Sequence, residues 1–232
     1  MNSDSPGAKP GAITRTHDSS GQPAGSPETL AEWALKYADF GLEVFPVDPD
    51  TKAPIGATEG PNGETIWMAT KGHRAATSDP ATITAWWTLR PDALIGGRIP
   101  KDVVVFDIDP RHDGHDTWDD IVAGHDLPVT RCHASGRNDG GFHIWFRNPN
   151  GHELKDRDGI DVLHHGHRYS ILPPSLHPET GQPYTWVHDP TTPMADLPEW
   201  LAEALTPAPV AQAATKAPTI ASNNAYHDDG PS

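Results

Sequence analysis

Cysteine is almost missing from this sequence, since Cys132 is the single thiol among 232 residues. One cysteine excludes an internal disulfide and any zinc site built on several cysteines, and it fits a reducing compartment, so a cytoplasmic location is expected. Long apolar runs are missing as well. No stretch approaches the roughly 18 apolar residues of a membrane span, and the first residues lack the apolar core of a signal peptide. We therefore expect no membrane association.

Positive charge is also scarce, with 17 Lys and Arg against 32 Asp and Glu and a formal net charge of −15. Binding to nucleic-acid phosphates is mostly a cationic, salt-sensitive interaction. The charge balance therefore argues against a broad nucleic-acid surface. It leaves room for a local basic groove, and it fits a site that concentrates cations.

Apolar residues make up only 35% of the chain, whereas Pro and Gly are frequent at 25 and 21 residues. Such a composition indicates that part of the chain does not fold. Residues 1–26 and 206–232 lack periodic apolar positions and are predicted to be disordered tails. Residues 27–205 are predicted to form one folded domain.

Apolar spacing and capping residues within this domain predict an α+β fold, with one mixed or antiparallel sheet and helices packed on it. Helices are expected over residues 26–41, 78–91, 116–123 and 196–205. Strands are expected over residues 42–47, 92–99, 103–109, 130–135, 141–148 and 184–188, with two more within 159–175. Residues 48–78 are predicted to be a long irregular stretch that is either functional or poorly ordered.

The segment VVVFDIDP, residues 103–110, carries the strongest chemical signal. Because side chains of a strand alternate between its two faces, Asp107 and Asp109 share one face. Two adjacent carboxylates repel each other unless a cation lies between them, and hard oxygen ligands suit Mg²⁺ or Mn²⁺. The alternative is a strand that simply ends in solvated aspartates.

Later segments contain further candidate ligands. Gly140 and Gly141 precede His143 in GGFHIWF, an arrangement that lets backbone N–H groups approach a phosphate and places the histidine beside it. A core histidine with a satisfied hydrogen bond is the alternative. Ser175 and His177 lie in a proline-rich loop that suits either a binding wall or a plain turn.

Two other patterns concern metals. Asp161, in GIDV, would add a third carboxylate to a two-metal site, although an aspartate near a turn is common. The histidines of HHGH, residues 164–167, match no common zinc spacing, and a zinc site is not expected.

These motifs occur in an order that resembles the N-terminal domain of bifunctional DNA primase/polymerases, in the archaeo-eukaryotic primase superfamily. The order is hydrophobic-Asp-hydrophobic-Asp, then a strand with His143, then hydrophobic-Asp at Asp161. The flanking segments ALKYADFGLEVFPVDPDTKAP, ATSDPATITAWWTLRPDALIGGRI and PPSLHPETGQPYTW are similar to the family as well. Leu163 stands where the family often has an arginine, and Arg168 follows later.

The resemblance implies an RRM-like primase–polymerase core and template-dependent nucleotidyl transfer from NTPs or dNTPs in DNA replication. Asp107, Asp109 and Asp161 would hold Mg²⁺ or Mn²⁺, with His143 completing the catalytic set. Nucleotide-binding residues would be Ser135, Gly140, Gly141, His143, Arg168, Ser175 and His177. A single-stranded DNA template would contact Arg137, Arg147 and Arg168.

Other functions remain open at this point. The same acidic set can activate water and cleave phosphodiesters. A non-catalytic nucleic-acid or nucleotide-binding module is the third reading, with the eight tryptophans as stacking platforms. Family members often carry a helicase after this domain, and no such segment is seen in this sequence. We therefore expect a stand-alone protein, a fragment, or a partner of a separate helicase.

Overall fold

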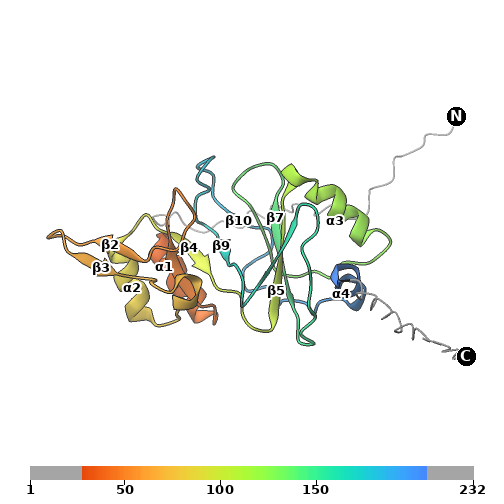
Figure 1. The fold of residues 1–232 in the computed structure, drawn as a ribbon, viewed down its shortest axis with the longest axis horizontal. Coiled ribbons are helices and arrows are strands. Elements are labelled where there is room, and N and C mark those ends of the chain that lie inside the picture. The colour runs from red at the N-terminus through yellow and green to blue at the C-terminus, as the bar shows by residue number, and fades with distance from the viewer. Residues whose placement is uncertain (1–27, 208–232) are drawn as a thin grey trace, which may run out of the picture.

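A computed structural model describes residues 28–207, so almost all of the two predicted tails lies outside the described residues. In this range, four α-helices accompany three sheets, and every strand pairing within them is antiparallel. The predicted α+β class is confirmed. Figure 1 shows an elongated molecule with helices at both ends and the larger sheets between them.

The largest sheet has five strands in the order β10-β6-β7-β5-β8. Its strands are β5 (Val103–Ile108), β6 (Cys132–Ala134), β7 (Phe142–Arg147), β8 (Ile160–His164) and β10 (Thr185–Trp186). Strand β5 lies between β7 and β8. Its residues alternate between two separate hydrophobic cores, with Val105 in one and Phe106 in the other. Both faces of this sheet are therefore covered.

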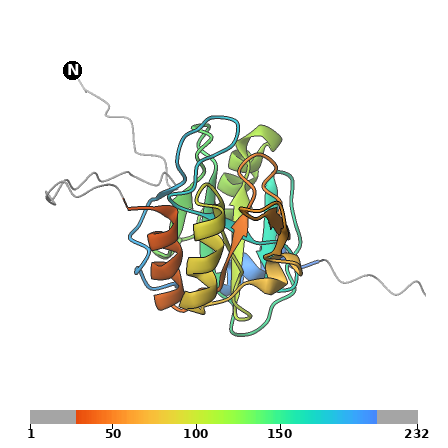
Figure 2. The same ribbon diagram turned by 90° about the vertical axis from the view of Figure 1, so that its left-hand side faces the viewer.

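A three-stranded sheet and two helices cover the face on which Val105 lies. The sheet has the order β1-β4-β9 and consists of β1 (Val44–Val47), β4 (Leu94–Gly97) and β9 (Ser170–Leu172). Helices α1 (Leu30–Asp39) and α2 (Pro80–Leu89) pack side by side at this end of the molecule (Figure 2). Thr29 and Glu32 form a capping box at the start of α1, and Asp79 caps α2.

Helices α3 (Gly114–Val122) and α4 (Glu199–Leu205) cover the opposite face, where Trp118 and Leu201 are buried with Phe106. Helix α3 begins two residues before its predicted start. It directly follows the short 3₁₀ helix η2 (Pro110–His112). No helix among residues 28–207 is long and apolar enough to cross a membrane.

The stretch predicted to be irregular, residues 48–78, contains regular structure. Strands β2 (Ala57–Glu59) and β3 (Thr65–Trp67) form a hairpin, and η1 (Gly72–Ala75) is a 3₁₀ turn. The hairpin closes at residues 60–64, where the N–H of Gly60 donates to the carbonyl of Glu64 at 2.7 Å. Short strands with little buried surface leave a weak hydrophobic pattern, which explains why this hairpin was not predicted.

Candidate functional site

Three predicted carboxylates lie at one end of the five-stranded sheet. Asp107 is the fifth residue of β5, and its direct partners are His143 on β7 and Asp161 on β8. Asp109 follows the strand and caps η2. Antiparallel register therefore aligns Asp107, His143 and Asp161, which are far apart in sequence, and Asp109 lies at the same end of β5.

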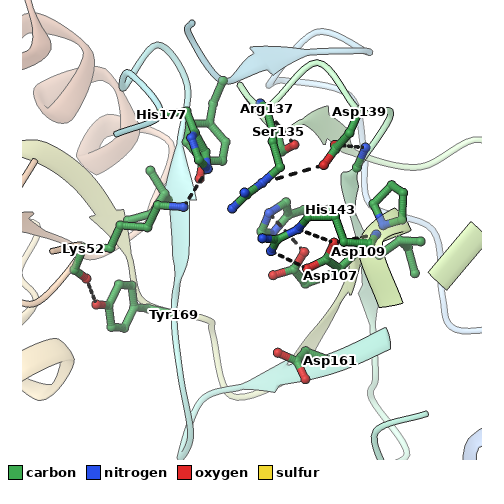
Figure 3. Close-up of a pocket in the computed structure, with 16 residues that line it drawn as sticks. Lys52, Asp107, Asp109, Ser135, Arg137, Asp139, His143, Asp161, Tyr169 and His177 are labelled. Carbon is green, nitrogen blue, oxygen red and sulfur yellow. Dashed lines mark hydrogen bonds and ion pairs between the residues drawn. The ribbon is translucent and has the colours of Figure 1, made fainter. Parts of the chain in front are cut away.

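A cavity of about 320 Å³ opens at this place. Figure 3 shows Lys52 and His177 on one side of it, facing Asp107, Asp109 and His143 on the other. Eight of the predicted site residues line it: Asp107, Asp109, Ser135, Arg137, Gly141, His143, Asp161 and His177. The remaining lining residues are Lys52, Ile108, Pro110, Arg111, Asp139, Tyr169, Ile171 and Tyr184.

A second, smaller cavity of about 240 Å³ lies between the carboxylates themselves. Asp107, Asp109 and Asp161 all line it, together with His112, Gly159 and Ile160. Hard oxygen donors on several sides of a polar space suit a divalent cation. Within the described range, however, no three His, Cys, Asp or Glu side chains are already gathered as a metal cluster.

Two of the carboxylates are paired with arginines. The Arg111 guanidinium donates to both oxygens of Asp109, at 3.1 and 2.7 Å, and this interaction holds the pKa of Asp109 far below its ordinary value. Asp161 pairs with Arg168. Burial nevertheless raises the pKa of Asp161, and the charges of Asp156 and Asp107 add to this effect, which outweighs the attraction of Arg168.

His143 lies between the carboxylates and the interior of the sheet. Its side chain is 8% exposed, and its Nε2 lies 3.5 Å from Oδ1 of Asp107. The ring of Tyr184 stands edge-on beside it, with the ring centroids 6.2 Å apart. The imidazole therefore presents one edge to the cavity and the other to buried neighbours.

The family comparison covers most of this region. The family described as "Bifunctional DNA primase/polymerase, N-terminal", or Prim-Pol, matches residues 34–200. The chain belongs to the Prim-Pol family. This confirms the resemblance seen in the sequence, and the family points to a nucleotidyltransferase type of enzyme. No curated protein matches the chain.

Several predicted ligands lie outside the Prim-Pol cavity. Ser175 is fully buried, and its hydroxyl accepts a hydrogen bond from the N–H of Ile95 at 2.8 Å, so it links the segment after β9 to β4. Arg147 lies at the other end of β7 and pairs with Asp196 at 2.7 Å. Arg168 is not a lining residue but reaches the site through Asp161.

The glycine-rich turn of this Prim-Pol domain is only partly available to a ligand. Gly141 lines the cavity, but its N–H donates to Oδ1 of Asp139 at 3.0 Å. Gly140 is not among the lining residues, and its carbonyl lies 3.0 Å from Nε2 of His115. Of the two N–H groups expected to contact a phosphate, that of Gly141 is therefore already paired with the side chain of Asp139.

Lys52 is the main site residue that the sequence did not single out. It follows β1, has a left-handed backbone with φ of 58°, and its carbonyl accepts from the hydroxyl of Tyr169. Its Nζ lies 2.9 Å from Nε2 of His177. Burial lowers the pKa of Lys52, and the nearby charge of Arg137 adds to this effect. The segment DPDTKAP, cited above for its family resemblance, was the one available signal.

Proposed function

We propose that this Prim-Pol domain is a template-dependent DNA primase/polymerase that forms phosphodiester bonds from nucleoside triphosphates. One observation carries the proposal. One cavity is lined by the carboxylates of Asp107, Asp109 and Asp161 and by the cationic or hydrogen-bonding groups of Lys52, Arg137 and His143. Nucleotidyl transfer needs both features, because the triphosphate carries several negative charges and its reacting phosphorus must be brought to an attacking hydroxyl.

Asp107, Asp109 and Asp161 would hold Mg²⁺ or Mn²⁺. Their oxygens are the donors that these ions prefer, and they surround the smaller cavity. The raised pKa of Asp161, caused by burial and neighbouring acids, indicates unfavourable negative charge that a cation would offset. A bound divalent ion supplies charge neutralisation at the phosphates and at the attacking oxygen.

The cationic side of the cavity would hold the nucleotide. Lys52 and Arg137 would supply positive charge for the phosphates, and Nε2 of His143, which also lines the cavity, would donate to a phosphate oxygen. Glu179 holds Arg137 with an Nη1–Oε2 distance of 2.6 Å, which fixes the guanidinium before the nucleotide arrives. Ser135, Gly141 and His177 complete the wall.

A single-stranded template would cross the rim of the cavity near Arg168, whose side chain is 45% exposed beside Asp161. Arg137 is the second nearby cation, whereas Arg147 is paired with Asp196 away from the cavity. So few contacts, in a chain of net charge −15, support weak binding of the template. The binding should weaken only modestly with added salt.

A synthesis assay tests the proposal. A single-stranded template is incubated with dNTPs or NTPs, with and without a primer, in Mg²⁺, Mn²⁺ or a chelator. Label on the primer or nucleotide reports synthesis, and label on the template reports cleavage. Products that lengthen only with template and metal support the proposal. Shortening of the template without synthesis would instead identify a phosphodiesterase, and binding without either product would identify a non-catalytic module.

A further inference from the structure

Five residues form a row across the five-stranded sheet, one on each strand. Trp186 is the partner of His133, His133 of His143, His143 of Asp107, and Asp107 of Asp161. Three of them lie on β5, β7 and β8 and belong to the proposed site. His133 is fully buried and does not line the cavity, yet its ring stacks on that of His143 with centroids 4.5 Å apart and an interplanar angle of 14°.

The indole of Trp145 determines where the hydrogen of His133 lies. Its Nε1 is 3.3 Å from Nδ1 of His133, and an indole N–H can only donate. Nδ1 of His133 is therefore an acceptor. Complete burial lowers the pKa of His133 well below its ordinary value, and the neighbouring His143 adds to this effect, so the ring is neutral near pH 7. A neutral ring with Nδ1 as acceptor carries its hydrogen on Nε2.

The hydroxyl of Ser170 connects the rings of His133 and His143. Ser170 is fully buried on β9, with Oγ 3.4 Å from Nε2 of His133 and 3.2 Å from Nδ1 of His143. Nε2 of His133 carries a hydrogen, for which the backbone of Ile171 is a second partner beside Oγ, so the serine O–H cannot donate to Nε2. Among the contacts of Oγ in residues 28–207, Nδ1 of His143 is then the acceptor for the serine hydrogen. Nδ1 of His143 then accepts and carries no hydrogen, so the ring hydrogen lies on Nε2, the atom that faces Asp107 and the cavity.

We propose that Trp145, His133 and Ser170 form a hydrogen-bonded relay that positions His143 and fixes its Nε2–H tautomer, so that it presents a donor to the phosphates of the nucleotide. The inference rests on the proposed function of His143 as a nucleotide ligand. The other tautomer would direct a lone pair of Nε2 at the carboxylate of Asp107 and at phosphate oxygens, which repel it. None of the three relay residues touches the nucleotide, so each is a positioning residue.

The relay is tested by NMR of protein labelled with ¹⁵N-histidine, in which the shifts of the two ring nitrogens report the tautomer. His143→Gln identifies the His143 signals by their loss. We expect the wild type to show an unprotonated Nδ1 and a protonated Nε2. Ser170→Ala and Trp145→Phe should each shift His143 toward a mixture of both tautomers. Ser175→Ala is the matched control, because it removes another buried serine hydroxyl, whose hydrogen bond is to Ile95 instead of a histidine.

Nucleotide affinity is measured in the same proteins with dATP and Ca²⁺, which avoids turnover. Ser170→Ala should raise the Kd for dATP by about fivefold, the effect of losing one hydrogen bond to a ligand-binding group. Unchanged His143 shifts in both relay variants would overturn the relay, as would a tautomer change with no effect on the Kd. The NMR shifts and the Kd do not depend on synthesis. Failure of the wild type to extend primers would therefore refute the proposed polymerase activity, whereas the relay would still be tested by the shifts and the Kd.

Discussion

The backbone N–H of Asp109 donates to the carbonyl of Gly159 at 2.8 Å. This bond ties the end of β5 to the turn before β8, and so it fixes two of the three proposed metal ligands relative to each other. Gly114, the first residue of α3, completes the junction by donating from its N–H to the carbonyl of Asp109 at 3.0 Å. The site is thus assembled where three backbone segments approach closely.

Gly159→Ala should disrupt this junction. Gly159 has a φ of 69°, and an added Cβ would lie 2.3 Å from the nitrogen of Gly114, so the backbone must move. Gly151→Ala is the matched control, because Gly151 has a φ of 66° but nothing within 4 Å of its Cβ position. We expect the free energy of unfolding to fall by about 1 kcal/mol in the control, from backbone strain alone, and by at least about 2 kcal/mol in Gly159→Ala. Equal losses of stability in the two variants, measured by thermal unfolding, would show that the close approach of Gly159 to Gly114 does not contribute to stability.

Two aspartates of the site should have opposite effects on stability without metal. The pKa of Asp109 is lowered by Arg111, so its charged form stabilises the fold above its ordinary pKa near 3.8, and that contribution is lost as the pH falls toward the lower folded value. The pKa of Asp161 is raised by burial, so the contribution of its neutral form is present at low pH and is lost as the pH rises through the folded value.

Melting temperatures in a chelator at pH 7 measure these contributions. Asp109→Asn should lower the melting temperature by about 2–4 °C, the change that ~1 kcal/mol produces in a domain of this size. Asp161→Asn should raise it. Both differences should shrink as the pH falls below about 4. A melting temperature that drops equally in both variants would contradict the assigned pKa directions.

Arg137 should contribute to nucleotide binding. Arg137→Gln removes a positive charge that Glu179 and Asp139 hold at the cavity wall, so we expect the KM for dNTP to rise about tenfold, roughly 1.4 kcal/mol. Arg98→Gln is the control, since the side chain of Arg98 is 19% exposed, close to the 17% of Arg137, and pairs with Glu43 outside the lining of the cavity. A KM for dNTP that equals the wild-type value in both variants, measured by steady-state kinetics, would show that the triphosphate binds elsewhere.

Lys52 should act in the same way from the other side of the cavity. Lys52→Gln keeps much of the side-chain length but removes the charge, and we expect weaker binding of dATP in the presence of Ca²⁺ by about tenfold. Lys36→Gln, at a lysine of α1 that pairs with Glu28, removes the same charge away from the cavity and should leave the Kd unchanged. Equal Kd values for Lys52→Gln and the wild type would exclude a phosphate contact.

Much of this architecture was readable from the sequence because it depends on local periodicity. The alternation of Asp107 and Asp109 after four buried residues predicted a shared face, and capping residues such as Asp79 predicted helix starts. The position of Asp161 beside Asp107 depends on the register of β5 and β8, which no local pattern encodes. The family resemblance, and not the spacing, assigned Asp161 to the same site as Asp107 and Asp109.

Other features depend on tertiary contacts and left no local signal. Lys52 reaches the cavity because its left-handed backbone and the hydroxyl of Tyr169 hold the loop there. Ser170 looks like any serine in an apolar strand, and its contacts with two histidines arise from the packing of β9 against the larger sheet. Ser175 was expected at the binding wall, but a buried backbone N–H needed its hydroxyl.

The rate of primer extension in Mn²⁺ by Asp107→Asn tests the central claim most directly. Asp102→Asn is the comparison, because Asp102 is an exposed aspartate immediately before β5. The account predicts that Asp107→Asn lowers the single-turnover rate at least about a thousandfold with no loss of fold, while Asp102→Asn extends like the wild type. Extension by a folded Asp107→Asn protein within tenfold of the wild-type rate would contradict the assignment of these carboxylates as the metal ligands of nucleotidyl transfer.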